Sequence, residues 1–233
     1  MYRILIVEDI ENTLHGLKRA ILASFSRAEE PLMVQVHTAE SVAQGNKLIE
    51  AAYEQKKPYH AVILDFYLPA EDGLDATKMD ESLCLLMRDL MPSTLVAHIT
   101  AYPDYGPVKQ HLLKVHQAQI DPRAFALSKL EADYADDLIN KLKAFFFGVR
   151  IEEQMDAIFG HDLELSFAAR GRLMRNRGEI VGSLTHNIAA LSRDIEMYWK
   201  DLDDMLKARI KRIFRVETVN KEVRVSLLQK AKL

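Results

Sequence analysis

The sequence predicts an α/β fold in which a parallel five-stranded sheet is covered by helices on both faces, followed by a mainly α-helical region. Short apolar runs alternate with segments of helical periodicity throughout residues 1–147. Neighbouring parallel strands must be joined by a crossover connection, and right-handed crossovers place helices on the faces of the sheet. At 233 residues the chain is also longer than one typical domain.

The five expected strands are apolar runs of four to six residues, rich in Val, Ile and Leu, a composition typical of strands buried on both faces. The sequence places them at residues 3–7, 32–36, 61–64, 94–99 and 124–128. The third, "AVIL", ends at Asp65, and a turn containing Pro69 and Gly73 follows it. A buried carboxylate at that point needs a charged or hydrogen-bonding partner.

Four segments show apolar side chains every three or four residues, which indicates amphipathic helices. They follow the first, second, third and fifth strands. The inward-facing residues are expected to be Leu14, Leu17, Ile21 and Phe25 in residues 11–25; Val42, Ile49, Ala52 and Tyr53 in a helix from about Thr38; Leu83, Leu86, Met87 and Leu90; and Tyr134, Leu138 and Leu142 in residues 131–147.

Composition excludes several classes of protein. Hydrophobic residues make up 48% and charged residues 28%, which is ordinary for a globular protein, and no apolar run approaches the roughly 20 residues of a membrane span. We therefore expect a cytoplasmic location. Cys84 is the only cysteine, so it is expected to be a buried small residue rather than part of a disulfide.

Net charge is −3 and is unevenly distributed. Residues 1–150 hold 16 Lys and Arg against 21 Asp and Glu, giving −5, whereas residues 151–233 hold 15 against 13, giving +2. Nucleic-acid-binding surfaces usually show clustered basic residues, so this weak excess argues against nucleic acid as the main partner.

Polar residues follow several of the expected strands. Glu8 and Asp9 follow the first, Asp65 ends the third, Thr100 follows the fourth and Lys129 the fifth. In an open parallel sheet these positions meet at one edge, where ligands bind. Three carboxylates there favour Mg²⁺, which prefers oxygen ligands, and beside the metal Asp65 could attack phosphorus as a nucleophile. Lys129 and Thr100 would then contact the phosphoryl oxygens.

These segments resemble the receiver domain of two-component response regulators. The resemblance rests on Glu8 and Asp9 after "ILIV", on "LDFYLPAEDGL", on "ITAY" and on Lys129 in "FALSK". It implies a flavodoxin-like (βα)5 fold over about residues 1–147, phosphorylation of Asp65 by a sensor histidine kinase or phosphotransfer protein, and Mg²⁺ as cofactor. It also implies that Asp9 and the Tyr67 carbonyl bind the metal directly and Glu8 through water, while Thr100 and Lys129 sense the phosphoryl group.

The sequence departs from this family at several positions. Leu130 stands where proline usually follows the lysine, and Ala126 stands at the aromatic switch position, with Phe125 one residue earlier. Residues 76–82 and 101–110 are expected to contain extra loop. Tyr67 and Tyr102 flank Asp65 and Thr100, and we hypothesise that their rings screen the acyl phosphate from water.

Other interpretations of the site remain open. Asp65 could simply form a turn, and Glu8 and Asp9 could cap the following helix. A haloacid-dehalogenase-like phosphatase also uses a strand-end aspartate with Mg²⁺, but it requires a second aspartate where this chain has Tyr67. No Gly-rich phosphate loop is present. A receiver fold used as a constitutive adaptor, independent of phosphate, is a further alternative.

The sequence predicts a receiver domain over residues 1–148 and a helical output or dimerisation domain over residues 149–233. Residues 149–159 continue a helical pattern, and apolar residues at steps of three and four from Val181 to Met205 indicate a coiled coil, a long helical hairpin, or a helix packed on a local bundle. Residues 214–229 could be helical or extended. At least one of the phenylalanines at 145–147 is expected to contact the second region or another subunit.

The predicted function is that of a response regulator: a switch that catalyses its own phosphorylation and dephosphorylation and signals through protein contacts, with a homodimer expected. A DNA-binding transcriptional regulator is one alternative, although no helix-turn-helix pattern emerges from the sequence. The other is a phosphorelay protein that uses His186, in "THNIAAL", as a phosphotransfer histidine.

Overall fold

The computed structural model describes residues 1–26, 32–72, 82–110, 124–159 and 178–228; of residues 159 and 178–186 it describes only the backbone. Contacts within the chain divide it into two compact units, residues 1–143 and residues 144–233.

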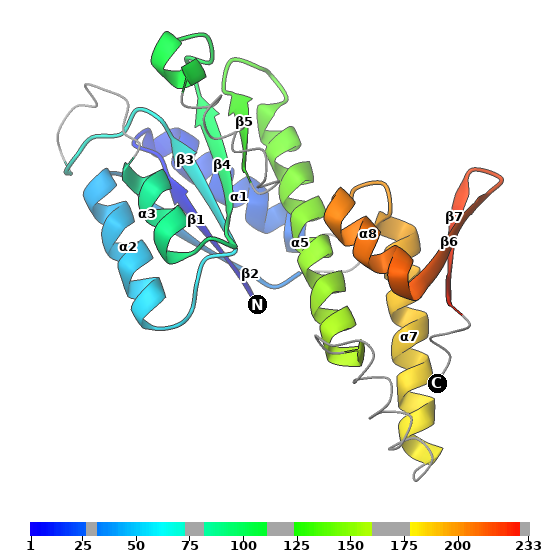
Figure 1. The fold of residues 1–233 in the computed structure, drawn as a ribbon. Coiled ribbons are helices and arrows are strands. Elements are labelled where there is room, and N and C mark those ends of the chain that lie inside the picture. The colour runs from blue at the N-terminus through cyan, green and yellow to red at the C-terminus, as the bar shows by residue number, and fades with distance from the viewer. Residues whose placement is uncertain (27–31, 73–81, 111–123, 160–177, 229–233) are drawn as a thin grey trace. The chain divides into compact units, whose positions relative to one another are not determined.

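The N-terminal unit is built on a five-stranded parallel sheet with the strand order β2-β1-β3-β4-β5 (Figure 1). Its strands are β1 (Tyr2–Val7), β2 (Val34–Ala39), β3 (Ala61–Asp65), β4 (Leu95–Thr100) and β5 (Ala124–Ser128). This is the flavodoxin-like order of doubly wound sheets, in which the order of strand addition reverses between β1 and β3. The predicted fold class is confirmed, and each strand lies within three residues of its expected bounds.

Helices cover both faces of this sheet. They are α1 (Glu11–Ser26), α2 (Val42–Glu54), α3 (Ser82–Leu90) and the first part of α5 (Tyr134–Phe159). Helices α2 and α3 lie side by side on one face and α1 lies on the other (Figure 1). Gly45 of α2 permits this contact, because a Cβ there would lie 2.9 Å from a methyl group of Leu83.

Three details of this unit differ from expectation. Helix α2 begins at Val42 rather than near Thr38, because β2 continues to Ala39 and Ser41 caps the helix. Tyr53, expected to face inward, is 53% exposed. Residues 106–110 are helical, so the expected extra loop is confined to residues 101–105, whereas most of residues 76–82 lie outside the described part of the chain.

The central strands β1, β3 and β4 are buried along almost their whole length, as their continuous apolar runs predicted, whereas the edge strands β2 and β5 are only partly buried. One core cluster joins β1 and β3 to α2 and α3, and Cys84 is buried within it. Burying such side chains contributes about 1.5–3 kcal/mol each. The core therefore fixes the positions of the strand ends that carry the polar residues.

The C-terminal unit combines helices with a β-hairpin. It contains the second part of α5, then α7 (Gly178–Tyr198), α8 (Asp204–Ile213), β6 (Phe214–Val219) and β7 (Glu222–Leu227). Strands β6 and β7 pair in antiparallel fashion around Asn220 and Lys221, whose φ angles of 52° and 69° are those of a tight two-residue hairpin turn. Residues 214–229, left undecided by the sequence, are thus extended through residue 227.

Helix α7 packs against the hairpin, and Glu196 on α7 contributes a polar contact there. Its Oε1 accepts a hydrogen bond from the backbone N–H of Val225, at a distance of 2.7 Å. The buried cluster of this unit includes Ile151, Leu191, Ile210 and Phe214, which come from α5, α7, α8 and β6.

The regular apolar spacing from Val181 to Met205 does not form one helix. Helix α7 ends at Tyr198, and a new helix starts at Asp204 with Asp203 as its N-cap, so the apolar spacing is divided between two helices. Met205, the last residue of the pattern, is 59% exposed. This part of the chain favours the local helix packing that the sequence left as an alternative.

Helix α5 is continuous from Tyr134 to Phe159, so the two helical segments predicted on either side of Gly148 are one. The Phe147 ring stacks on Tyr198 with centroids 3.8 Å apart, which confirms that one of the three phenylalanines meets the second region. Arg150 and Asp194 pair at 3.3 Å within the same unit. Among the described residues, none of the helices is both long and apolar enough to cross a membrane.

Candidate functional site

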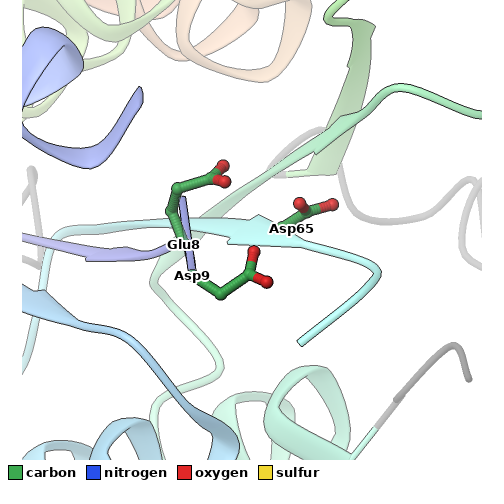
Figure 2. Close-up of side chains that lie close together, drawn as sticks. All are labelled: Glu8, Asp9 and Asp65. Atoms are coloured by element: carbon green, nitrogen blue, oxygen red, sulfur yellow. The ribbon is translucent and has the colours of Figure 1, made fainter. Parts of the chain in front are cut away.

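Three carboxylates converge at the carboxyl ends of β1 and β3. Glu8 and Asp9 directly follow β1, and Asp65 is the last residue of β3. One oxygen atom from each lies within 4.8 Å of the others, and Figure 2 shows the three side chains close together. The structure therefore confirms the prediction that these three residues lie at one edge of the sheet.

Asp65 is 8% exposed, and its two oxygens have different partners. Oδ1 accepts hydrogen bonds from the backbone N–H of Phe66 at 2.6 Å and of Tyr67 at 3.3 Å. Oδ2 accepts a hydrogen bond from Lys129 Nζ at 2.5 Å. The backbone thus holds one oxygen of the carboxylate, and a cation faces the other.

Lys129 bridges two strand ends. Its Nζ also donates to Glu8 Oε2 at 2.6 Å, and its backbone N–H donates to the Thr100 carbonyl at 2.7 Å. Burial would lower the pKa of Lys129, but the negative charges of Asp65 and Glu8 outweigh burial and raise it above its ordinary value. Lys129 therefore stays charged.

The other two carboxyls are less acidic than usual. Burial raises the pKa of Glu8, which is fully enclosed; Lys129 and the N–H of Ile10, 3.3 Å from Glu8 Oε1, oppose this shift. Burial also raises the pKa of Asp9. Three acidic groups against one lysine leave excess negative charge, which favours binding of a further cation.

Thr100 ends β4 and is 1% exposed. Its Oγ1 accepts a hydrogen bond from the Tyr102 N–H at 3.0 Å. This bond uses an oxygen lone pair, so the hydroxyl proton can still be donated. Together with Lys129, Thr100 thus presents a donor group at the same sheet edge as Asp65.

A cluster of three tyrosines lies beside Asp65. The Tyr67 ring centroid is 5.2 Å from that of Tyr102 and 6.3 Å from that of Tyr105. Burial, then the neighbouring tyrosines and Asp65, raise the pKa of the Tyr67 phenol, so this phenol stays neutral at ordinary pH. Sequence reasoning named Tyr67 and Tyr102 but missed Tyr105, whose only signal was an aromatic residue three positions after Tyr102.

Tyr134, the first residue of α5, is a second group that sequence reasoning missed as part of the site's surroundings. Burial is the main cause that raises its pKa, and the charges of Lys129, Glu8 and Asp65 also act on it. The available indication in the sequence was that Tyr134 follows Lys129 by five residues, but we predicted only a core position for it.

The usual position of the aromatic switch is occupied by Ala126, which lies opposite His98 in the register of β4 and β5. His98 is buried and stacks on Phe66, with ring centroids 4.5 Å apart. Phe125 instead contacts Lys141 of α5, whose Nζ lies 5.4 Å from the ring centroid. An aromatic pair is therefore present behind Asp65, but it comes from β4 and the residue after β3 rather than from β5.

The donor atoms suit a hard divalent cation. Carboxylate oxygens are the ligands that Mg²⁺ prefers, and Glu8, Asp9 and Asp65 form the group with this potential among the described residues. Tyr67, whose carbonyl was the fourth predicted ligand, follows Asp65 by two residues. His186, the predicted alternative phosphotransfer residue, has a side chain outside the described part of the chain.

Comparisons with known proteins gave matches among solved structures. No protein-family model matches, and no curated protein matches. The beryllofluoride-activated receiver domain of DrrB has a TM-score of 0.43 at 19% identity, covering 63% of this chain and 97% of that one. The phosphorylated cyanobacterial phytochrome response regulator RcpA has a TM-score of 0.42 at 13% identity, covering 62% and 92%. The response regulator RcsB, solved in a DNA complex, has a TM-score of 0.38 at 16% identity, covering 88% and 95%. Each of these three solved structures is described as a response regulator or as a receiver domain.

Proposed function

We propose that this protein is a phosphorylation switch of the response-regulator type, in which Asp65 accepts a phosphoryl group from the phosphohistidine of a sensor histidine kinase or phosphotransfer protein. The observation that carries the proposal is the contact of Lys129 Nζ with both Asp65 Oδ2 and Glu8 Oε2, beside Asp9. A strand-end carboxylate, two further acidic groups and a lysine are the groups that phosphoryl transfer to a carboxylate requires.

In the proposed reaction, a carboxylate oxygen of Asp65 attacks phosphorus. The phosphorus–nitrogen bond of the donor breaks, the imidazole leaves with the bonding electron pair and takes a proton, and an acyl phosphate forms on Asp65. Backbone amides already hold Oδ1, so Oδ2 is the attacking oxygen. Lys129 lies next to it and would move from a carboxylate oxygen to a phosphoryl oxygen, while the Thr100 hydroxyl donates to another.

Mg²⁺ would be held directly by Asp9, Asp65 and the Tyr67 carbonyl, with Glu8 acting through water. When bound, it would offset the negative charge of the phosphoryl oxygens and of the acidic group. Water later hydrolyses the acyl phosphate, and the tyrosine cluster slows this step by limiting the approach of water.

The C-terminal unit would provide the output, through protein contacts and a homodimer. Exposed apolar side chains at Met197, Met205 and Val219 support contacts with another protein. The unit holds Trp199, the single tryptophan of the chain, whereas the tyrosine cluster belongs to the N-terminal unit. Tyrosine fluorescence therefore reports mainly on the N-terminal unit, which holds seven of the eight tyrosines, and tryptophan fluorescence reports on the C-terminal unit.

The test is to add Mg²⁺ and beryllofluoride, a phosphoryl mimic, to the wild type and to Asp65→Ala. We expect the wild type to change its tyrosine fluorescence and Asp65→Ala to show no change; a change in molecular mass would report dimerisation. Equal responses of the two proteins, or no response in the wild type, would overturn Asp65 as acceptor and favour the constitutive adaptor. Thr94→Val is the matched control, because it removes a buried hydrogen bond to the Tyr59 carbonyl at the opposite end of β4.

A DNA-binding output is the second candidate, favoured by one feature that the sequence did not reveal. Helix α7, a short turn and α8 are followed directly by the β6–β7 hairpin, and α8 carries cationic side chains. Lys207 and Lys211 lie 6.0 and 5.7 Å from the Trp199 ring centroid, and Arg212 is exposed. Retention on duplex DNA that falls with salt, and falls again in Lys211→Glu, would favour this output over protein contacts.

A further inference from the structure

The segment that follows Asp65 is attached to the start of α2. The backbone N–H of Val42 donates to the Pro69 carbonyl at 2.9 Å, and the N–H of Ala43 donates to the Ala70 carbonyl at 3.0 Å. The first amides of a helix have no partner within the helix. Here the chain after β3 supplies their acceptors, although the two segments are nearly 30 residues apart in the sequence.

Ser41 and Asp72 add a side-chain contact to this attachment. Ser41 is the N-cap of α2 and is completely buried; its Oγ accepts from the Gln44 N–H at 3.2 Å and donates to Asp72 Oδ1 at 2.5 Å. The negative charge of Asp72 also lies near the positive end of the α2 dipole. We call the Ser41 to Asp72 hydrogen bond the Ser41–Asp72 clamp.

Tyr67 lies between two fixed points. On one side, the N–H groups of Phe66 and Tyr67 are bonded to Asp65 Oδ1. On the other, Leu68 is 4% exposed and shares the core cluster with Val42 of α2, and the carbonyl of Pro69 is held by that same residue. The peptide that carries the Tyr67 carbonyl therefore has little freedom to rotate while α2 and the segment stay attached.

We propose that Ser41 and Asp72 are positioning residues for the cation site, which hold the Tyr67 carbonyl where Asp9 and Asp65 can share a metal ion with it. This inference rests on the proposed function. Neither residue would touch the cation or the phosphoryl group. They act by fixing the segment after β3 to α2, so the third ligand is ordered when the chain folds rather than when the metal binds.

Residues that orient metal ligands typically change metal affinity by 10- to 100-fold when removed. We expect Ser41→Ala and Asp72→Ala each to raise the Mg²⁺ dissociation constant about tenfold. Ser41→Thr and Asp72→Asn keep a hydroxyl donor and an oxygen acceptor, respectively, so each should stay within about threefold of the wild type. Asp72 is exposed, so its variants should fold even if Ser41→Ala does not.

The experiment is a Mg²⁺ titration of the full chain, followed by tyrosine fluorescence and by calorimetry, with Thr94→Val as control. Thr94 is 5% exposed and makes the same kind of buried side-chain hydrogen bond in the same unit, away from the strand ends that carry the carboxylates. Loss of stability alone would affect Thr94→Val and the clamp variants alike. Weakened Mg²⁺ binding in Ser41→Ala and Asp72→Ala, with rescue by the conservative variants, would support the clamp.

Two results would refute the role of the Ser41–Asp72 clamp, and both can be distinguished from the results that would refute the proposed function. Unchanged Mg²⁺ affinity in Asp72→Ala, or an equal change in Thr94→Val, would refute the clamp while leaving the switch intact. A wild type that binds no Mg²⁺, or binds it as well as Asp9→Asn does, would instead refute the cation site, and the clamp with it. At saturating Mg²⁺ the clamp variants should recover beryllofluoride binding, since their defect lies in the metal step.

Discussion

Replacing Lys129 by methionine should strongly destabilise the N-terminal unit. Lys129 Nζ lies 2.5 and 2.6 Å from oxygens of Asp65 and Glu8, and the three side chains are only 11%, 8% and 0% exposed. Methionine fills similar space without charge, so the acidic groups lose their counter-charge. Removing one partner of a buried pair typically costs about 3–5 kcal/mol. Repulsion between two carboxylates roughly 5 Å apart, at an effective dielectric constant of about 20, amounts to about 3 kcal/mol.

The pH dependence identifies the cause. Burial already raises the pKa of Glu8, and loss of Lys129 removes the main opposing influence. A carboxyl whose folded-state pKa exceeds its unfolded value favours folding in its protonated form, so Lys129→Met should gain stability as pH falls through the raised pKa of Glu8. Adding Glu8→Gln to Lys129→Met should recover about half of the loss at pH 8, because one of the unpaired charges is then absent.

The assay is urea unfolding without Mg²⁺ at several pH values. Tyrosine fluorescence follows mainly the N-terminal unit, which holds seven of the eight tyrosines, and Trp199 follows the C-terminal unit, since the two units need not unfold together. A loss below about 1 kcal/mol at pH 8, or a loss that Glu8→Gln does not reduce, would refute the view that Lys129 is the counter-charge of this site.

Four further predictions follow from the described contacts. Mg²⁺ at ten times its dissociation constant should stabilise the wild type by about 1.4 kcal/mol in thermal unfolding, and Asp9→Asn should lose this gain. Tyr67→Ala should shorten the life of the acyl phosphate severalfold, measured by loss of labelled phosphate; an unchanged rate, or an equal change in Tyr67→Phe, would end the screening hypothesis. Lys221→Gly should stabilise the C-terminal unit by about 1 kcal/mol, because glycine adopts the positive φ of that turn without strain, whereas Lys221→Ala should not. Burial, followed by Arg3 and Lys18, lowers the pKa of His37, so stability should fall as pH drops through about 6.5, and His37→Gln should remove that part of the pH profile.

The sheet and the acidic group could be predicted because local patterns determine them. Buried parallel strands read as continuous apolar runs, and the carboxyl ends of such strands meet at one edge of the sheet. These two rules are sufficient to bring Glu8, Asp9, Asp65 and Lys129 together. Burial of the central strands β1, β3 and β4 fixes the sheet edge at which these polar side chains lie.

The C-terminal unit was predicted less well, for physical reasons that specific residues show. The hairpin turn uses Asn220 and Lys221 without the glycine that usually marks it, and β6 is mostly exposed, so its apolar alternation is imperfect. The apolar spacing continues past Tyr198, but the N-cap at Asp203 starts a new helix. The apolar periodicity alone therefore did not reveal that one helix ends and another begins within the pattern.

The sequence analysis also failed to predict contacts between segments that lie far apart in the sequence. The Ser41–Asp72 clamp joins residues 31 positions apart, and nothing near either residue in the sequence indicates the pairing. Tyr105 likewise joins the tyrosine cluster only through the path of the chain after β4. Such contacts depend on tertiary packing, which periodicity does not encode.

The hydrogen bond from Val225 to Glu196 also has a consequence for solubility. A strand edge with free amide groups can pair with a strand of another molecule and seed aggregation. On β7 the Glu196 carboxylate occupies the Val225 amide and places a negative charge where an incoming strand would approach. Replacing Glu196 by alanine would leave the Val225 amide without this acceptor and remove the negative charge, and we expect the defect to show as concentration-dependent precipitation.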